Sequence, residues 1–322
     1  MENYKIPIYI SKYNIYDIYY NDNNTIVIIS INKINNLQLK LNNNFIDFEF
    51  IECPHKHTYI YYLKINIDYK QKIKICINDS IIYTYINKYI EFNDKIIMST
   101  LVKNEDEYII QWIFYHMNLG VDHFIIYDNS NIDNLGIILH DFIKKNIVVL
   151  IKWNYSYRFP TGINGQTTQQ NHSIYAFQNC KYIGLFDIDE YVNPQIRIDL
   201  KSFFDMFIIK NKINIETISG FALSNKFFYN PSNLSTKKYD FLKIISCDII
   251  NNYGDRPKMF IIPKNVKSFS VHIVTSGLPM YFINNKIIFF NHYFFLNKEN
   301  RGLNHTQIVD CSILNYINIS SI

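Results

Sequence analysis

The spacing of apolar and polar positions divides the chain into two parts. Up to about residue 93, short runs of β-branched and aromatic residues alternate with clusters of Asn. The clearest of these runs are 25–30, 45–50, 59–65 and 72–77. Short strands at regular intervals, with turn residues between them, are typical of a small β-sandwich. We therefore predict a β-rich, sandwich-like N-terminal domain over residues 1–93.

From about residue 94 onward, the pattern changes to strands that alternate with helices. Buried strands are predicted at 95–102, 123–127, 147–153 and 182–186. The first predicted helix runs from an N-cap at Asn104, with Glu107 completing a capping box, to a stop at Gly120. A second helix ends near Lys145, and a third covers 166–180. This order implies an α/β domain with a parallel, doubly wound sheet over residues 94–322.

Composition excludes several classes of protein. Of the 322 residues, 48% are hydrophobic and 16% aromatic, which is ample for a packed core and rules out a disordered chain. The net charge of +4 is too small to indicate nucleic-acid binding. The five Cys residues are far apart and form no CxxC motif, a pattern typical of reduced thiols.

The same sequence predicts a cytoplasmic protein without a membrane span. No run reaches the roughly 20 apolar residues that a membrane helix needs, and the first residues lack the pattern of a signal peptide. The preference for Ile, Asn, Lys, Tyr and Phe follows from AT-rich codons. Such a bias would suit a large DNA virus or a protist.

Polar residues follow three of the predicted strands directly. They are Lys103–Glu105, Asp128–Ser130 and Asp187–Asp189. Because the carboxyl ends of parallel strands lie along one edge of a sheet, we expect these three clusters to lie close together. Two carboxylates at positions i and i+2 can share a hard divalent cation, Mg²⁺ or Mn²⁺, and leave coordination sites open for phosphate oxygens.

The order of these motifs resembles glycosyltransferase family 92 and its relatives in the family 2 group. The resemblance covers about residues 96–300 and rests on KNEDEYIIQWIFYHMNLGVDHFIIYDNSN, FDIDEYVNP, Arg256–Pro263, Val271–His272 and Asn291–Tyr293. It implies a GT-A fold, with a mostly parallel sheet and helices on both faces. It also implies a metal-dependent, inverting transfer of a sugar from a nucleotide-diphosphate donor to a glycan or glycoprotein acceptor. The resemblance favours a UDP-sugar as donor, and UDP-galactose is the commonest donor in the family.

The resemblance also implies roles for single residues. Asp187 and Asp189 would form the DxD motif of the family, with Asp189 bound directly to the metal and Asp187 reaching the ribose or the metal. The nucleotide would be contacted by Lys103, Glu105, Asp128 and Asp187, and the leaving diphosphate would be neutralised by Lys258.

A C-terminal His commonly completes the metal site in GT-A enzymes. His272 is the first choice, because it ends a predicted strand at 267–272, and His292 is the second, because it follows a predicted strand at 287–290. An imidazole ligand would favour Mn²⁺ over Mg²⁺. The remaining conspicuous histidines are predicted to be structural or to lie in a solvated loop, namely His55, His57, His116 and His123.

The sequence leaves the catalytic base and the class of enzyme open. An inverting transfer needs a carboxylate near the acceptor hydroxyl, and the candidates are Glu190, Glu216, Asp240 and Asp255. Apolar residues that run into Asp187-Ile-Asp189 also fit a haloacid-dehalogenase-like phosphatase, although Glu190 stands where Thr or Val is usual in that class. A third alternative is a non-catalytic glycan-binding module on a degenerate transferase fold.

Overall fold

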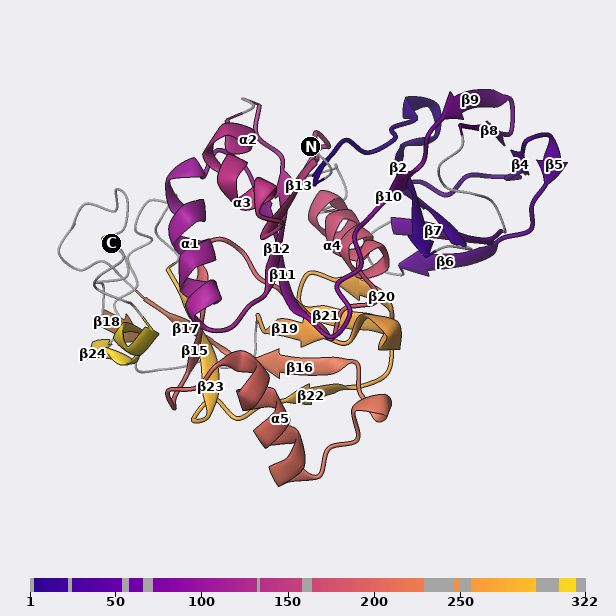
Figure 1. Cartoon of the computed structure of the whole chain (residues 1–322). Helices are drawn as coiled ribbons and strands as arrows, with labels where there is room; N and C mark the ends of the chain where they lie inside the picture. Colours follow the sequence, from indigo (N-terminus) through magenta and orange to yellow (C-terminus); the bar gives the residue numbers. More distant parts are fainter. Residues whose placement is uncertain are drawn as a thin grey trace.

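The protein is a mixed α/β molecule in which strands outnumber helices, which confirms the predicted class (Figure 1). The computed structural model describes residues 3–22, 25–53, 58–65, 72–131, 134–157, 164–228, 246–248, 256–293 and 307–316. Among the helices of this part of the chain, none is long and apolar enough to cross a membrane.

An eight-stranded sheet forms the centre of the molecule. Its order is β1 (Tyr4–Lys5), β13 (Val148–Lys152), β12 (His123–Asp128), β11 (Ile96–Val102), β14 (Tyr182–Leu185), β19 (Lys258–Ile261), β16 (Gly220–Leu223) and β22 (Met280–Phe282). The first five strands are parallel to one another, whereas β19 is antiparallel to both of its neighbours. All four strands predicted between residues 95 and 186 lie in this sheet. β11, β12 and β13 follow one another in the sheet in one direction, and the next strand in the sequence, β14, lies on the other side of β11. The strand order therefore reverses between β11 and β14, which flank a topological switch point.

Both faces of this sheet are buried. Because alternate residues of a strand point to opposite faces, Met98 of β11 packs with Trp112 of α1 (Asp106–Asn118), whereas Ile97 packs with Ile174 of α4 (Asn164–Ala176). The first face also carries α2 (Leu135–Ile138), α3 (His140–Lys144) and α5 (Leu200–Asn211). In Figure 1, α4 lies between the central sheet and the N-terminal strands.

Two details of the predicted helices are wrong. The helix predicted to start from Asn104 begins at Asp106 instead, and its N-cap, Glu105, makes no side-chain capping bond. Asn104 has a left-handed backbone with φ of 56°, and its N–H donates to Ser130 Oγ at 2.9 Å, so it closes the turn after β11 and cannot cap. The helix predicted to end near Lys145 is divided into α2 and α3 at Leu139.

The N-terminal strands form two sheets that enclose a core. One sheet has the order β10 (Asn87–Lys88), β2 (Ile15–Asp22), β3 (Thr25–Ser30), β7 (Thr58–Lys64) and β6 (Glu49–Cys53). The other has the order β5 (Asn44–Phe45), β4 (Leu39–Leu41), β8 (Ile73–Ile77) and β9 (Ser80–Thr84). Ile18 and Ile28 of the first sheet share a cluster with Leu41 and Ile75 of the second. The run predicted as one strand at 45–50 is divided between the two sheets.

The N-terminal part is joined closely to the rest of the molecule. Its strand β1 pairs with β13 at the edge of the central sheet, and the outer face of the five-stranded sheet packs on α4 through Tyr19 and Val27. The boundary at residue 93 stays a prediction, because these contacts cross it.

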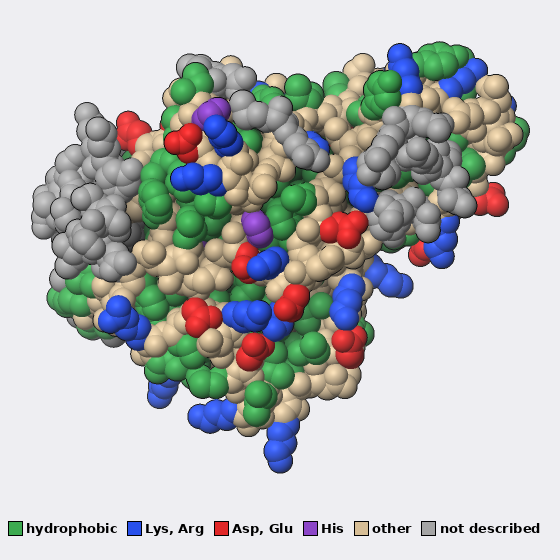
Figure 2. All heavy atoms as spheres, in the orientation of Figure 1, with side chains coloured by type: hydrophobic (Ala, Val, Ile, Leu, Met, Phe, Trp, Pro, Cys, Tyr) green, Lys and Arg blue, Asp and Glu red, His purple; other side chains and the backbone are tan. Residues whose placement is uncertain are grey.

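The remaining elements are short and lie mostly toward the C-terminus. They are β15 (Glu190–Pro194), β23 (Ile288–His292), β17 (Asn225–Phe227), β18 (Ser246–Asp248), β24 (Gln307–Val309), β20 (Val266–Ser270), β21 (Ile273–Gly277) and the 3-10 turns at Ser11–Tyr13, Ile215–Thr217, Pro263–Asn265 and Ser312–Tyr316. On the described part of the face drawn in Figure 2, basic and acidic side chains are interspersed.

A buried carboxylate connects the N-terminal sheet to α4. Asp17 of β2 is fully buried and accepts hydrogen bonds from the backbone N–H of Ile8 and Ile18, both at 2.8 Å. Its other oxygen accepts from Tyr89 Oη at 2.7 Å and lies 3.0 Å from His172 Nε2 on α4. This carboxylate therefore stabilises the contact between the two parts of the chain.

Replacing Asp17 by Ala should reduce the free energy of unfolding by roughly 3 kcal/mol, because four groups that face the carboxylate lose their partner in a dry environment. Urea denaturation followed by circular dichroism measures this loss. Asp79→Ala is the control, since Asp79 is exposed and pairs only with surface groups, and its midpoint should stay near that of the wild type. Equal midpoints for the two variants would contradict this account.

Candidate active site at the carboxyl edge of the central sheet

Asp187 and Asp189 lie in the turn between β14 and β15, at the carboxyl end of the parallel strands. The Asp187 carboxylate accepts a hydrogen bond from Gln166 Nε2 of α4 at 3.0 Å and one from Lys258 Nζ at 2.6 Å. Its side chain is still 41% exposed. Asp187 is thus fixed in orientation and open to a ligand.

Lys258 is a buried cation at the centre of this turn. It begins β19, and because β19 runs antiparallel to β14, its first residue lies at the edge where β14 ends. The ammonium group is 1% exposed and lies 3.0 Å from Glu190 Oε2 as well as 2.6 Å from Asp187 Oδ2. One buried charge is therefore shared by two carboxylates.

Glu190 is enclosed beneath the turn. Its Oε2 also accepts the backbone N–H of Asp187 at 2.8 Å, and Trp112 Nε1 donates to its carbonyl oxygen at 3.0 Å. Burial raises the pKa of Glu190 from 4.5 to about 7, although the charge of Lys258 acts in the opposite direction. Glu190 is therefore a carboxyl group that titrates near neutral pH.

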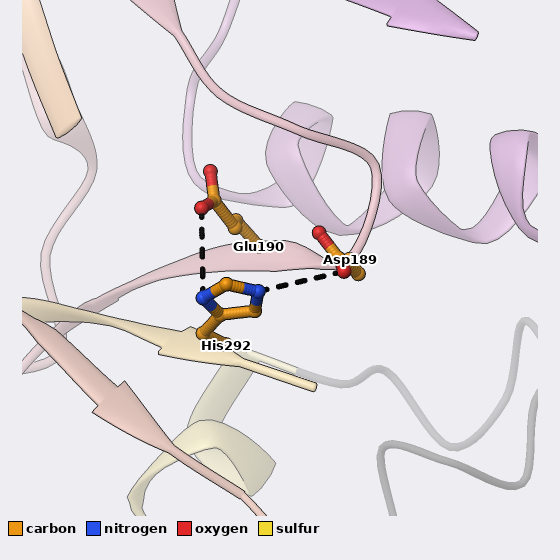
Figure 3. Close-up of side chains that lie close together, drawn as sticks. All are labelled: Asp189, Glu190 and His292. Atoms are coloured by element: carbon orange, nitrogen blue, oxygen red, sulfur yellow. Dashed lines mark ion pairs between the residues drawn. The ribbon is translucent and has the colours of Figure 1, made fainter. Parts of the chain in front are cut away.

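His292 faces both acidic residues, as Figure 3 shows. β15 and β23 are antiparallel with Glu190 directly opposite His292, so the pairing of the two strands brings the imidazole to the turn. His292 Nε2 lies 3.5 Å from Asp189 Oδ2, and Nδ1 lies 3.7 Å from Glu190 Oε1. Burial alone would lower the pKa of His292, but the charges of Asp189 and Glu190 outweigh burial and raise it.

These three side chains have the composition of a metal site. One ligand atom from each of Asp189, Glu190 and His292 lies within 4.8 Å of the others. Two carboxylates and an imidazole are a donor set that suits Mn²⁺ and related transition metals. Binding of a cation would displace the imidazole proton, because only the neutral ring is a ligand.

A polar pocket of about 650 Å³ lies along the same edge, at the ends of β11, β12 and β13. It is lined by Lys103, Asn129, Ser130, Asn131, Lys152, Asn154, Tyr155, Ser156 and Tyr157. The volume is in the usual range for small-molecule sites. Since β11 lies between β12 and β14, this pocket and the turn that carries Asp187 and Asp189 lie at the ends of neighbouring strands.

The residues predicted to contact a nucleotide lie at different depths. Lys103 lines the pocket, whereas Glu105, at the N-cap position of α1, is not part of its lining. Asp128 is fully buried and pairs with Lys152 Nζ at 2.8 Å, so Lys152 lines the pocket and Asp128 lies behind it. Lys152 and Tyr155 were not among the predicted site residues, although they lie at the end of β13, and position at a strand end is the signal that identified the other clusters.

His272 lies apart from the three grouped side chains. It stands in the turn between β20 and β21, its Nδ1 is 3.1 Å from the carbonyl oxygen of Pro257, and burial together with the charge of Lys258 lowers its pKa to about 4. The two histidines that were predicted to be structural lie against backbone carbonyl groups: His116 Nδ1 is 2.8 Å from Trp112 O, and His123 Nδ1 is 2.8 Å from Asn146 O. His55 and His57 lie outside the described residues.

Two of the four candidate bases can be placed. Glu190 lies at the site, whereas Glu216 is exposed and pairs with Lys264 at 3.1 Å. Lys264 shares a pocket with Asp94 and Lys181, which precede β11 and β14, so Glu216 is at the opposite edge of the sheet. Asp240 and Asp255 lie outside the described residues.

Two comparisons with known proteins, one with family models and one with single sequences, lead to the same family. A family model described as glycosyltransferase family 92 matches residues 96–316. Three similar relatives carry the name glycosyltransferase family 92 protein. One from Ricinus communis is 24% identical over 116 residues, which are 36% of this chain and 19% of the relative. Proteins from Oryza sativa subsp. japonica and Arabidopsis thaliana are 26% and 32% identical over 95 residues, which are 29% of this chain and 15% of each relative. The aligned segments thus span less than a fifth of these relatives.

Replacing Lys258 by Met should destabilise the protein, and more so at about pH 8 than at about pH 5.5. The folded-state pKa of Glu190, about 7, lies above its ordinary 4.5, so the folded state binds the proton more tightly and stability falls as pH rises between these values. Without Lys258, the pKa of Glu190 rises further. At high pH, the ionised carboxylates of Asp187 and Glu190 would then lack the positive charge that they share in the wild type.

Urea denaturation at the two pH values measures this difference. Lys264→Met is the matched control, because Lys264 is an exposed partner of a single carboxylate. A loss of stability in Lys258→Met that is equal at both pH values would contradict the shared-charge interpretation.

Proposed function

The chain belongs to glycosyltransferase family 92, and we propose that it transfers a sugar from a nucleotide-diphosphate donor to a glycan or glycoprotein acceptor with a divalent cation bound at Asp189 and His292. The observation that carries this proposal is the grouping of Asp189, Glu190 and His292 beside a polar pocket at the ends of the parallel strands. The family match favours a transferase over a haloacid-dehalogenase-like phosphatase.

We further propose that the central sheet is that of a GT-A fold. Support comes from the strand order, in which β13, β12 and β11 are followed by β14 on the far side of β11. The polar pocket and the Asp187–Asp189 turn then occupy the two sides of the switch point, where open α/β sheets bind their ligands.

The side chains of the turn would each have a different role in binding the donor and its cation. Asp189 and His292 would hold the cation, and Asp187, kept in place by Gln166 and Lys258, would orient the diphosphate or ribose. A bound divalent cation would offset the negative charge that develops on the departing diphosphate. The charge of Lys258 would act on the diphosphate from beneath Asp187, because the ammonium group is buried.

The polar pocket would hold the ribose and phosphate part of the donor, and UDP is the nucleotide that we propose to test. Lys103 and Lys152 give its lining a positive charge, which suits an anionic ligand. Glu190 would hold Lys258 and His292 in position, since its oxygens face those two groups. Asp240 and Asp255, outside the described residues, stay the candidates for the base of an inverting reaction.

Replacing His292 by Ala should weaken Mn²⁺-dependent binding of UDP at least about tenfold, a loss of roughly 1.4 kcal/mol. Asp189→Asn should abolish this binding, since a neutral amide is a poor ligand in place of the carboxylate. Isothermal titration calorimetry with UDP and Mn²⁺ measures both effects. His140→Ala is the control, because His140 is an exposed residue on α3.

His272→Ala tests the alternative ligand in the same assay. We expect its effect to be smaller than that of His292→Ala, because Asp189 lies 3.5 Å from His292 Nε2. A larger effect of His272→Ala would transfer the ligand role to His272, and unchanged binding in Asp189→Asn would remove the metal site.

Turnover is tested by incubating the protein with nucleotide sugars, including UDP-galactose, and measuring the nucleotide released. We expect Mn²⁺-dependent release that is lost in Asp189→Asn. Release of phosphate from p-nitrophenyl phosphate instead would favour the phosphatase alternative. Binding of glycans without any turnover would indicate a non-catalytic module.

A further inference from the structure

A second pocket, of about 390 Å³, opens beside the polar pocket and shares Lys152, Asn154, Tyr155 and Ser156 with it. Its other wall is made by the N-terminal segment, through Ile6, Pro7, Tyr9, Asn14 and Tyr16. These residues precede residue 96, where the match to the family begins. The N-terminal part of this chain therefore contributes directly to the edge of the candidate site.

The floor of this second pocket is a fixed aromatic surface. The Tyr155 ring stacks on Tyr16, with centroids 3.8 Å apart and planes 11° apart, and Trp153 meets Tyr155 edge-on at 4.7 Å. Tyr155 Oη also donates a hydrogen bond to the carbonyl oxygen of Tyr16. These contacts hold the ring of Tyr155 in one orientation.

Tyr9 stands at the open side of the pocket. Its ring lies 5.3 Å from that of Tyr155, and half of its surface is exposed. The backbone on either side is anchored, since the Ile8 N–H donates to Asp17 at 2.8 Å and the Ile10 N–H donates to the carbonyl oxygen of Ile15 at 3.0 Å. An anchored backbone with an exposed ring is suited to stack on a planar ligand.

The two pockets differ in chemistry. The first is lined mainly by Lys, Asn and Ser side chains, whereas the second adds Tyr9, Tyr16, Ile6 and Pro7 to the residues that the two pockets share. In the second pocket, Asn14 and Asn154 each provide an amide with one acceptor and two donors. A polar space that continues into an aromatic one, edged by amides, matches a ribose phosphate joined to a heterocyclic base.

The distance along the sheet fits such a ligand. β13, which ends at the second pocket, is three strands away from β14, which ends at the Asp187–Asp189 turn. At about 4.8 Å between neighbouring strands, the separation is roughly 14 Å. An extended nucleoside diphosphate spans a similar distance between its terminal phosphate and its base.

We propose that the second pocket binds the nucleobase of the donor and that Tyr9 of the N-terminal segment stacks on it. This inference rests on the proposed function, because it assumes a nucleotide whose diphosphate lies at Asp187 and Asp189. The N-terminal strands are then part of the donor site, in addition to supporting α4.

The experiment compares Mn²⁺-dependent binding of UDP and of inorganic diphosphate by calorimetry. Loss of an aromatic ring that stacks on a base weakens binding by about 1–3 kcal/mol, so Tyr9→Ala should raise the Kd for UDP at least about fivefold. Its Kd for inorganic diphosphate should not change, because that ligand has no base. Tyr9→Phe should bind UDP as the wild type does.

Tyr83→Ala is the matched control, since Tyr83 is an exposed tyrosine on β9 of the N-terminal sandwich. Unchanged UDP binding in Tyr9→Ala, together with normal binding in the wild type, would overturn this inference alone. A wild type that binds neither UDP nor diphosphate would overturn the proposed function and the inference with it. A parallel loss of UDP and diphosphate binding would assign Tyr9 a structural role and overturn the base site.

Discussion

The buried charge of Lys258 is the constraint on which the candidate site depends. A desolvated ammonium is stable only when it is paired, and here its partners are Asp187 and Glu190, at 2.6 and 3.0 Å. The three residues come from β19, from the turn after β14 and from the start of β15. The site therefore forms only when these separate segments are all in place. Glu190 is also the residue of β15 that pairs with His292 of β23, and this register brings the imidazole to Asp189.

Helix α4 extends this constraint to the N-terminal part of the chain. Gln166, near its start, holds Asp187, and His172, farther along the helix, lies against Asp17 of β2. His172 Nδ1 also lies 2.7 Å from Tyr127 Oη on β12. A polar side chain on a helix that is covered by sheets on two sides is stable there when it has a partner, and these contacts provide one for Gln166 and for His172. The N-terminal strands thus support the site through α4, independently of any ligand that residues 6–16 contact.

Local signals in the sequence were sufficient for the central strands and for the acidic turn. β11, β12, β13 and β14 are continuous apolar runs because both faces of the sheet are covered, and the polar residues at their ends are explained by parallel topology. Long-range pairing could not be read in the same way. The proximity of His292 to Asp189 depends on the register of β15 with β23, which joins residues about a hundred positions apart. Similarly, the burial of Asp128 depends on its pairing with Lys152, and the left-handed turn at Asn104 depends on Ser130.

The central claim is that a divalent cation binds between Asp189 and the imidazole of His292. Pulsed electron paramagnetic resonance of Mn²⁺ bound to the protein with UDP tests it directly, because a coordinated imidazole nitrogen couples to the electron spin of the metal. The account predicts this nitrogen coupling in the wild type and in His272→Ala, and its loss in His292→Ala. A nitrogen coupling that persists in His292→Ala, or is absent from the wild type, would contradict the account.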